Sequence, residues 1–79
     1  MYLNTAIRKR IIGLMKERNW SANHLSLQAG IHRSGLNKFL RKDTSSIKIE
    51  TIELLCEACG ITLEEFFASP LFKDVQVKD

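Results

Sequence analysis

The sequence predicts a single all-α domain built from five short helices. Its 79 residues suffice for one compact domain and are too few for a second, because domains rarely contain fewer than about 50 residues. Only one proline and four glycines interrupt the chain. No strand-like alternation of apolar and polar residues occurs before residue 71, and apolar residues recur instead at helical spacing. A charged fraction of 27% is too low to predict disorder.

Capping residues mark the starts of the first two predicted helices. Asn4 or Thr5 can cap the first and Ser21 the second, because short polar side chains accept hydrogen bonds from the free N–H groups that begin a helix. Gly30 stands just past the expected end of the second helix, where glycine adopts the left-handed conformation at little cost. The third helix is expected at Arg33–Arg41.

The last two predicted helices have clear boundaries as well. Gly60 ends the fourth, while Thr62 and Glu65 have the spacing of a capping box at the start of the fifth. Pro70 provides the stop. The apolar stripes of the five helices predict a core made of Ile7, Ile11, Leu14, Leu25, Ile31, Leu36, Phe39, Ile52, Leu55, Ile61 and Phe66.

Charge is distributed unevenly along the chain. Residues 1–48 hold ten Lys and Arg against two acids, a balance of +8, whereas residues 49–79 hold two lysines against seven acids, a balance of −5. The two halves sum to the net charge of +3. A basic region on a small domain with an isoelectric point near 9.1 favours a polyanionic partner, although a solvated lysine-rich surface is the alternative interpretation.

The second and third helices, with the turn Gly30-Ile31-His32 between them, form a predicted helix-turn-helix of about twenty residues. The outer face of the third helix carries no acid. Its long donors and amides suit the major groove of DNA, where Arg and Lys can pair with guanine and Asn with adenine. A solvated face usually includes Glu or Asp, so the pattern favours DNA binding. The residues of this face are Arg33, Ser34, Asn37, Lys38 and Arg41.

These residues resemble a known family, the xenobiotic-response-element class of helix-turn-helix regulators, which includes the phage repressors and Cro proteins. The resemblance covers roughly residues 7–67, on landmarks that include Arg10-Ile11, Trp20-Ser21, Ala29-Gly30-Ile31, Thr51-Ile52-Glu53 and Gly60-Ile61-Thr62-Leu63. It implies a five-helix, lambda-repressor-like bundle whose third helix enters the major groove, usually within a dimer. By position, it implies base contacts from His32, Arg33, Ser34, Asn37 and Lys38. It implies phosphate contacts from Ser21, Ala22, Asn23, Arg41, Lys42, Ser45, Ser46 and Lys48.

Three positions depart from the family pattern. His32 occupies a turn position that is commonly Ser or Thr and caps a helix less well. Gly35 lies inside the third helix, at a cost of about 1 kcal/mol relative to Ala. Leu40 stands where many relatives have a Glu that pairs with a first-helix arginine, here Arg10, so a drier contact is expected in place of that ion pair.

Other functions find little support in the sequence. Cys56 and Cys59 have C-x-x-C spacing but lack further ligands for zinc, so we expect them to pack in the core. Trp20 is expected to pack rather than to stack on a base. The chain shows no catalytic constellation and no cofactor motif, which argues against an enzyme. No apolar run reaches the roughly 18 residues of a membrane span, and no signal peptide is evident, so a cytoplasmic location is expected.

The sequence therefore predicts a helix-turn-helix DNA-binding domain over residues 1–69 and a tail over residues 70–79. The predicted function is a transcriptional repressor that binds double-stranded DNA. The alternative is a protein-interaction module, such as an antitoxin-like or anti-repressor domain. Apolar residues near the end of the chain favour a homodimer on an inverted-repeat operator, although they could equally pack on their own core: Phe67, Leu71, Phe72, Val75 and Val77.

Overall fold

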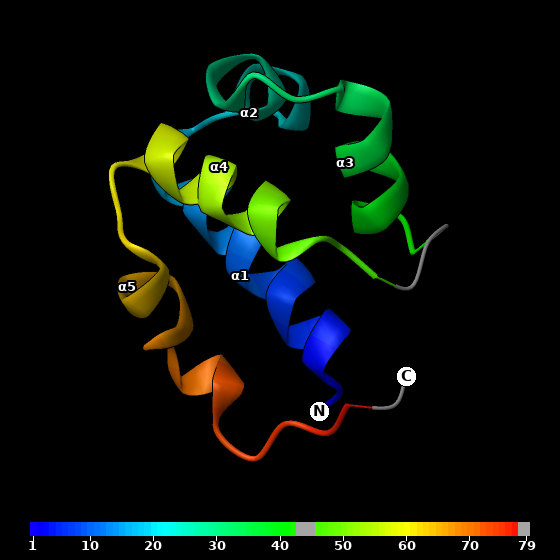
Figure 1. Cartoon of the computed structure of the whole chain (residues 1–79), viewed down its shortest axis with the longest axis vertical. Helices are drawn as coiled ribbons and strands as arrows, with labels where there is room; N and C mark the ends of the chain where they lie inside the picture. Colours follow the sequence, from blue (N-terminus) through cyan, green and yellow to red (C-terminus); the bar gives the residue numbers. More distant parts are fainter. Residues whose placement is uncertain (43–45, 78–79) are drawn as a thin grey trace.

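A computed structural model of the chain describes residues 1–42 and 46–77 and confirms the all-α fold. In the described part of the chain, five α-helices follow one another, with a short 3-10 helix after them (Figure 1). Their bounds are α1 Leu3–Arg18, α2 Ala22–Ala29, α3 Arg33–Leu40, α4 Ile49–Cys59, α5 Leu63–Phe67 and η1 Pro70–Phe72. None of the helices in the described part of the chain is both long and apolar enough to cross a membrane.

The core combines buried side chains from all five α-helices. Most of the predicted core residues are buried, and Phe39, Phe66 and Ile11 are among the largest side chains with less than 2% exposure. Ile31 and Ile61 are only half-buried, which corrects the prediction for these two positions. Both directly follow a helix-ending glycine, so the chain is already turning at the surface when it reaches them. Both still pack against the core from its edge.

The start of α1 differs from the prediction that Asn4 or Thr5 caps it. The helix begins at Leu3, and its N-cap position is Tyr2, whose side chain makes no capping hydrogen bond. The backbone N–H of Leu3 instead donates to the carbonyl of Gln76, 2.7 Å away, in an isolated parallel bridge between Tyr2 and Gln76. The tail thus accepts a hydrogen bond from one of the N–H groups at the start of α1 that have no partner within the helix.

The predicted boundaries at Ser21, Gly30, Gly60 and Thr62 are confirmed, whereas α3 ends at Leu40 instead of Arg41, and Pro70 begins η1 after α5 has already ended at Phe67. Ser21 Oγ accepts a hydrogen bond from the N–H of His24 at 3.0 Å, and Thr62 forms the full capping box with Glu65. Gly30 and Gly60 have φ values of 70° and 72°, in the left-handed region where a side chain is strained. These residues make α2 short and set the angle at which the chain enters α3 and α5.

Three arginines of α1 donate hydrogen bonds to the C-terminal ends of three other helices. Arg8 Nε donates to the carbonyl of Phe39 in α3 at 2.6 Å, and Arg18 Nη2 donates to the carbonyl of Cys59 in α4 at 2.7 Å. Arg10 donates to α5, from Nε to the carbonyl of Phe66 at 2.9 Å. A cation at a helix C-terminus satisfies free carbonyls and complements the helix dipole. Part of the positive charge of the N-terminal half therefore stabilises the fold.

These contacts also resolve the expectation for Leu40. Arg10 has its partners on α5, since its Nη2 also donates to the carbonyl of Glu65 at 3.0 Å. Leu40 is half-buried and packs against the core, as expected for an apolar contact at this position. An acidic residue at position 40 is not needed to satisfy Arg10, because backbone carbonyls accept its hydrogen bonds.

The tail packs back on the bundle. Three phenylalanine rings pack together there. The centroid of the Phe67 ring lies 4.9 Å from those of Phe66 and Phe72, and the centroids of Phe66 and Phe72 lie 5.9 Å apart. The chain then returns to the N-terminus, so that Gln76 lies beside Tyr2 and the red segment approaches the blue start of α1 (Figure 1). Val77 is 83% exposed. Most of the apolar tail that the sequence offered for dimerisation is therefore used within the chain, and Val77 remains outside.

Candidate nucleic-acid interface

The helix-turn-helix is held together by backbone geometry and by one small buried residue. Ser26 is 2% exposed at the inner side of α2, and its hydroxyl donates to the carbonyl of Ala22 at 2.9 Å. The N–H of Ile31 donates to the carbonyl of Ser26 at 3.0 Å, which closes the turn after Gly30. A small side chain whose hydroxyl is satisfied lets α3 pass close to α2 without a buried unpaired polar group.

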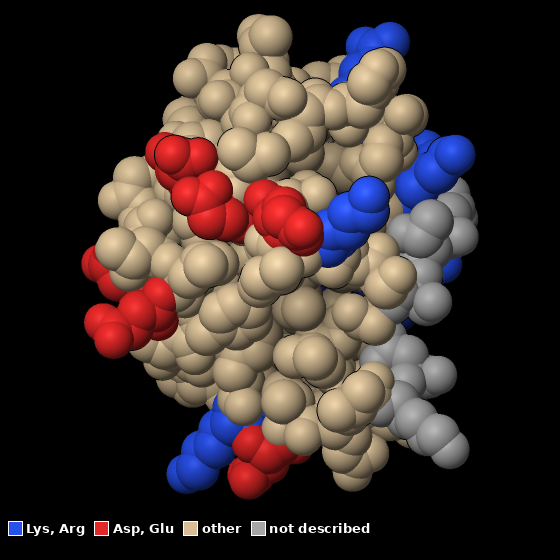
Figure 2. All heavy atoms as spheres, in the orientation of Figure 1, with Lys and Arg blue, Asp and Glu red and all other residues tan. Residues whose placement is uncertain are grey.

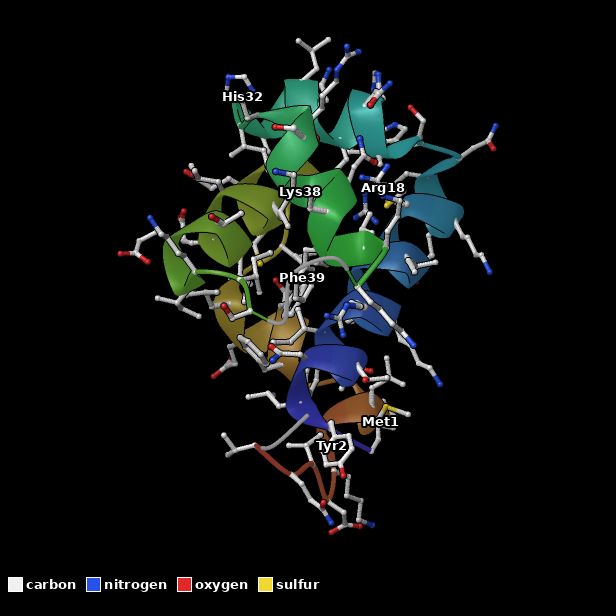
Figure 3. The ribbon with its side chains drawn as sticks, turned by 90° about the vertical axis from the view of Figure 1, so that its right-hand side faces the viewer. Met1, Tyr2, Arg18, His32, Lys38 and Phe39 are labelled. Atoms are coloured by element: carbon white, nitrogen blue, oxygen red, sulfur yellow. The ribbon has the colours of Figure 1, made fainter. Side chains whose placement is uncertain are left out.

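The residues predicted to contact bases line the outer side of α3 and its start. His32, Arg33, Ser34 and Lys38 are exposed. Asn37 is half-buried, and its Nδ2 donates to Oδ1 of Asn23 on α2 over 3.4 Å. His32 occupies the N-cap position of α3 without a side-chain hydrogen bond, as its poor capping ability predicts. Figure 3 views this face with Lys38 in front.

The residues predicted to contact phosphates lie on both sides of α3. Ser21 and Asn23 are exposed at the start of α2, and Ala22 is half-buried between them. The second group is exposed at the end of α3 and before α4, and consists of Arg41, Lys42, Ser46 and Lys48. Ser45, which belongs to the same prediction, lies outside the described residues. The fold thus places donors on both sides of the predicted recognition helix.

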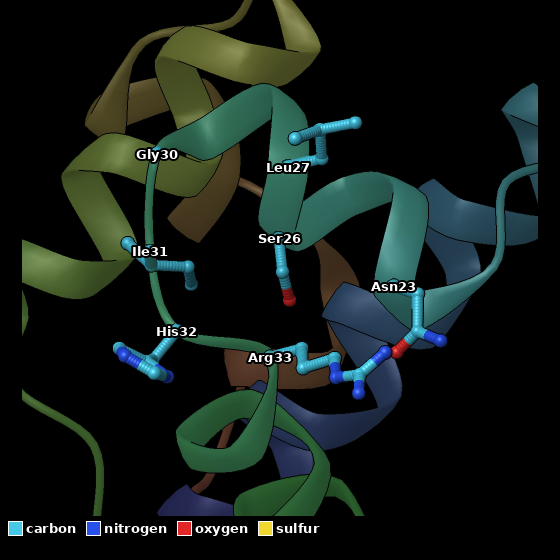
Figure 4. Close-up of a pocket in the computed structure, with 7 residues that line it drawn as sticks. All are labelled: Asn23, Ser26, Leu27, Gly30, Ile31, His32 and Arg33. Carbon is cyan, nitrogen blue, oxygen red and sulfur yellow. The ribbon is translucent and has the colours of Figure 1, made fainter.

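An open groove of about 600 Å³ runs between α2 and the start of α3. Asn23 and Arg33 lie at one end of it, with their side chains directed toward one another, while His32 lies at the other end (Figure 4). Between them the groove is lined by Ser26, Gly30 and Ile31, and by Leu27, which is 75% exposed. The groove combines polar ends with an apolar middle.

Acidic and basic side chains occupy largely different surfaces. Figure 2 shows acidic side chains over α4 and α5 and basic side chains along the edge that carries α3, while a basic and an acidic group lie together at the lower end of the view. Burial, followed by the charge of Glu57 and a hydrogen bond with its side chain, raises the pKa of Glu53 on α4. Negative charge kept away from α3 leaves its basic side open to a polyanion.

The remaining conspicuous residues are part of the packing. Cys56 and Cys59 are buried free thiols, as predicted, and burial raises the pKa of Cys56 to about 11. A thiol of this kind is a poor nucleophile and a poor metal ligand at neutral pH. Trp20 is half-buried against the core with its ring edge toward His24, which confirms the packing prediction. Among the described residues, no three His, Cys, Asp or Glu side chains are grouped so that they could hold a metal ion.

Sequence reasoning missed two residues near this surface. Leu27 lines the groove, although the predicted interface did not include it. Arg8 is 5% exposed and bonds the end of α3, although its charge gives no sign in the sequence that it is buried. The signal for Arg8 was its position directly after Ile7 and three residues before Ile11, which puts it at the border of the stripe.

Comparisons with known proteins agree with this geometry. The crystal structure of the prophage Lp1 protein 11 has a similar fold, with a TM-score of 0.81 and 24% sequence identity over 95% of this chain and all of that one. No protein with a curated description matches the sequence. The family model of the Cro/C1-type HTH DNA-binding domain matches residues 10–69, which is more than half of the chain. The chain therefore belongs to the family of Cro/C1-type helix-turn-helix DNA-binding domains.

Proposed function

We propose that this protein is a transcriptional repressor that reads the major groove of double-stranded DNA with α3. The observation that carries the proposal is the exposed, acid-free outer face of α3, formed by Arg33, Ser34 and Lys38 with Asn37 at its border. Guanidinium, ammonium, amide and hydroxyl groups are the side-chain groups that pair with base edges in the major groove. A helix of this width fits that groove, whereas the minor groove is too narrow.

Phosphate contacts would orient α3 in the groove. The start of α2 offers its free N–H groups and the Ser21 hydroxyl to one phosphate, while Arg41, Lys42 and Lys48 can neutralise phosphates on the other side of α3. Such contacts carry no sequence information, but they set the register in which Arg33 and Lys38 meet the bases. Repression would follow from occupation of an operator that overlaps a promoter.

A second copy would complete an operator complex, because one short helix reads too few base pairs for useful specificity. The C-terminal region is our proposed contact. Most of the tail packs on its own core, so the dimer contact must use the apolar side chains that stay exposed near the N-terminus and the end of the tail. These are Met1 at 51%, Tyr2 at 45% and Val77 at 83% exposure. A two-fold dimer predicts an inverted repeat whose half-sites are about ten base pairs apart.

Selection from a randomised pool of DNA duplexes tests the proposal. We expect an enriched inverted repeat, bound with an affinity that falls steeply with salt because phosphate contacts release counterions. The selected duplex placed across a promoter should lower transcription in a purified system when the protein is added. Failure to enrich any sequence, or binding that does not depend on salt, would contradict the proposal.

Light scattering of Val77→Asp tests the dimer. The new charge should shift free protein toward the monomer and remove cooperative binding to the inverted repeat, while binding to a half-site remains. Leu54→Asp is the matched control, because it places the same charge at an exposed leucine of α4. A wild-type protein that is monomeric both free and on its selected DNA would exclude the dimer.

A further inference from the structure

The recognition helix has weak intrinsic stability. α3 contains eight residues, and isolated helices shorter than about 12 residues are marginal in water. Its N-cap residue His32 makes no side-chain capping bond, and its first turn contains no acid to complement the helix dipole. Gly35 adds backbone freedom in the middle. Contacts from outside α3 must therefore supply much of its order.

Arg8 contacts α3 from beneath through two groups of a single residue. Its Nε donates to the carbonyl of Phe39 at 2.6 Å, and its guanidinium carbon lies 4.5 Å from the centre of the Phe39 ring. The same carbonyl accepts the N–H of Lys42 at 3.1 Å, in the bond that closes the helix end. Arg8 thereby restrains both the backbone and the ring of Phe39, the residue that directly follows Asn37 and Lys38.

Burial makes this contact strong. Arg8 is 5% exposed and the Phe39 ring is 1% exposed, so the hydrogen bond forms in a region from which water is excluded. A charged donor in such surroundings binds its acceptor more strongly than a neutral donor does, and an unsatisfied partner is costly. Arg10 and Arg18 donate comparable hydrogen bonds, but the acceptors of these bonds lie on α5 and α4 and not on α3.

We infer that Arg8 is a positioning residue for DNA recognition: it holds the C-terminal half of α3 in its helical conformation before DNA arrives. The inference rests on the proposed role of α3. A recognition helix that is already ordered loses less conformational entropy on binding, so its affinity for the operator is higher. Arg8 has no path to the DNA itself, because α3 lies between them.

Two substitutions of Arg8 isolate the hydrogen bond. Arg8→Gln places an amide nitrogen the same number of bonds from Cα as Nε, so a donor to the Phe39 carbonyl is kept. Arg8→Met has similar length and shape but no donor. The same two substitutions at Arg10 form the matched control, because Arg10 Nε bonds the end of α5 instead.

Amide hydrogen exchange provides the first readout and needs no DNA. In Arg8→Met, the N–H groups of Arg41 and Lys42, which close the end of α3, should exchange about tenfold faster relative to those of α1 and α4. Arg8→Gln should retain most of the protection. In Arg10→Met, exchange at the end of α3 should change only as much as in the other helices. Equal acceleration of all helices in Arg8→Met, or loss of α3 protection in Arg8→Gln, would overturn the inference.

Operator affinity provides the second readout, on the duplex selected above. Arg8→Met should bind about tenfold more weakly than Arg10→Met at equal folded fraction, and Arg8→Gln should be close to wild type. If Arg8→Met does not fold, Arg8→Gln decides: acceleration of exchange in all helices alike overturns the inference. A protein that binds no DNA would refute the proposed function, while the exchange measurement would still decide whether Arg8 orders α3.

Discussion

Asn37 Nδ2 on α3 donates a hydrogen bond to Oδ1 of Asn23 on α2 over 3.4 Å. The first residue is predicted to contact bases and the second to contact a phosphate. The bond orients the Asn37 amide and leaves its Oδ1 directed away from Asn23, where it can accept from a base amino group. This hydrogen bond therefore links a predicted base-contacting residue to a predicted phosphate-contacting residue.

We expect Asn23→Ala and Asn37→Ala to have non-additive effects on operator affinity. Removing either partner frees the other amide, so the double variant should lose less than the sum of the single losses, with a coupling of about 0.5 to 1 kcal/mol. A double-mutant cycle of binding constants at fixed salt measures this coupling. Strict additivity would show that the two side chains act independently on DNA.

Substitutions on α3 and at its end should affect binding in different ways. Arg33→Ala and Lys38→Ala should each reduce discrimination between the operator and random DNA by about 1 to 3 kcal/mol, because base contacts are lost. Arg41→Ala and Lys48→Ala should weaken binding to all sequences alike and lower the salt dependence. Titrations with operator and scrambled duplexes distinguish the groups, and the assignment fails if both groups lose discrimination equally.

Two glycines of the helix-turn-helix should respond to alanine in opposite directions. Gly30 has a φ of 70°, so Gly30→Ala should lower the free energy of unfolding by about 1 to 2 kcal/mol. Gly35 lies within α3, and an added Cβ there would meet no atom within 4 Å. Gly35→Ala should therefore raise the free energy of unfolding by about 1 kcal/mol. Urea denaturation measures both, and stabilisation by Gly30→Ala would contradict the turn geometry.

The carboxylate of Glu53 should destabilise the protein at neutral pH. Its pKa in the folded state is raised, so the folded protein binds the proton more tightly than the unfolded chain does, and the penalty disappears as pH falls through the folded pKa. Glu53→Gln should therefore raise the unfolding midpoint at pH 7 and have little effect near about pH 3. Glu64→Gln is the control, since Glu64 lies exposed in the first turn of α5, where a carboxylate is favourable. An equal rise of the unfolding midpoint in Glu64→Gln at pH 7 would show that the loss of one negative charge, and not the site of Glu53, stabilises the protein.

Local chemistry in the sequence was sufficient to determine the helices and most of the core. Ser21, Gly30, Gly60 and Thr62 act through their own backbone and nearest neighbours, so their roles could be read from spacing alone. Apolar periodicity identified the inward faces for the same reason, because helical geometry fixes which side chains share a face. Once the inward face of α3 was assigned, the remaining residues of the helix could be predicted to form its outer face.

Tertiary structure alone decided what the charged side chains of α1 do and where the tail goes. Arg8, Arg10 and Arg18 bond carbonyls that lie 31 to 56 residues away in the chain, and no local pattern specifies such a partner. The first turn of α1 is likewise completed by Gln76 from the other end of the chain. Backbone carbonyls are present at every residue, so their positions, which only the assembled bundle defines, determine which arginine reaches which helix end.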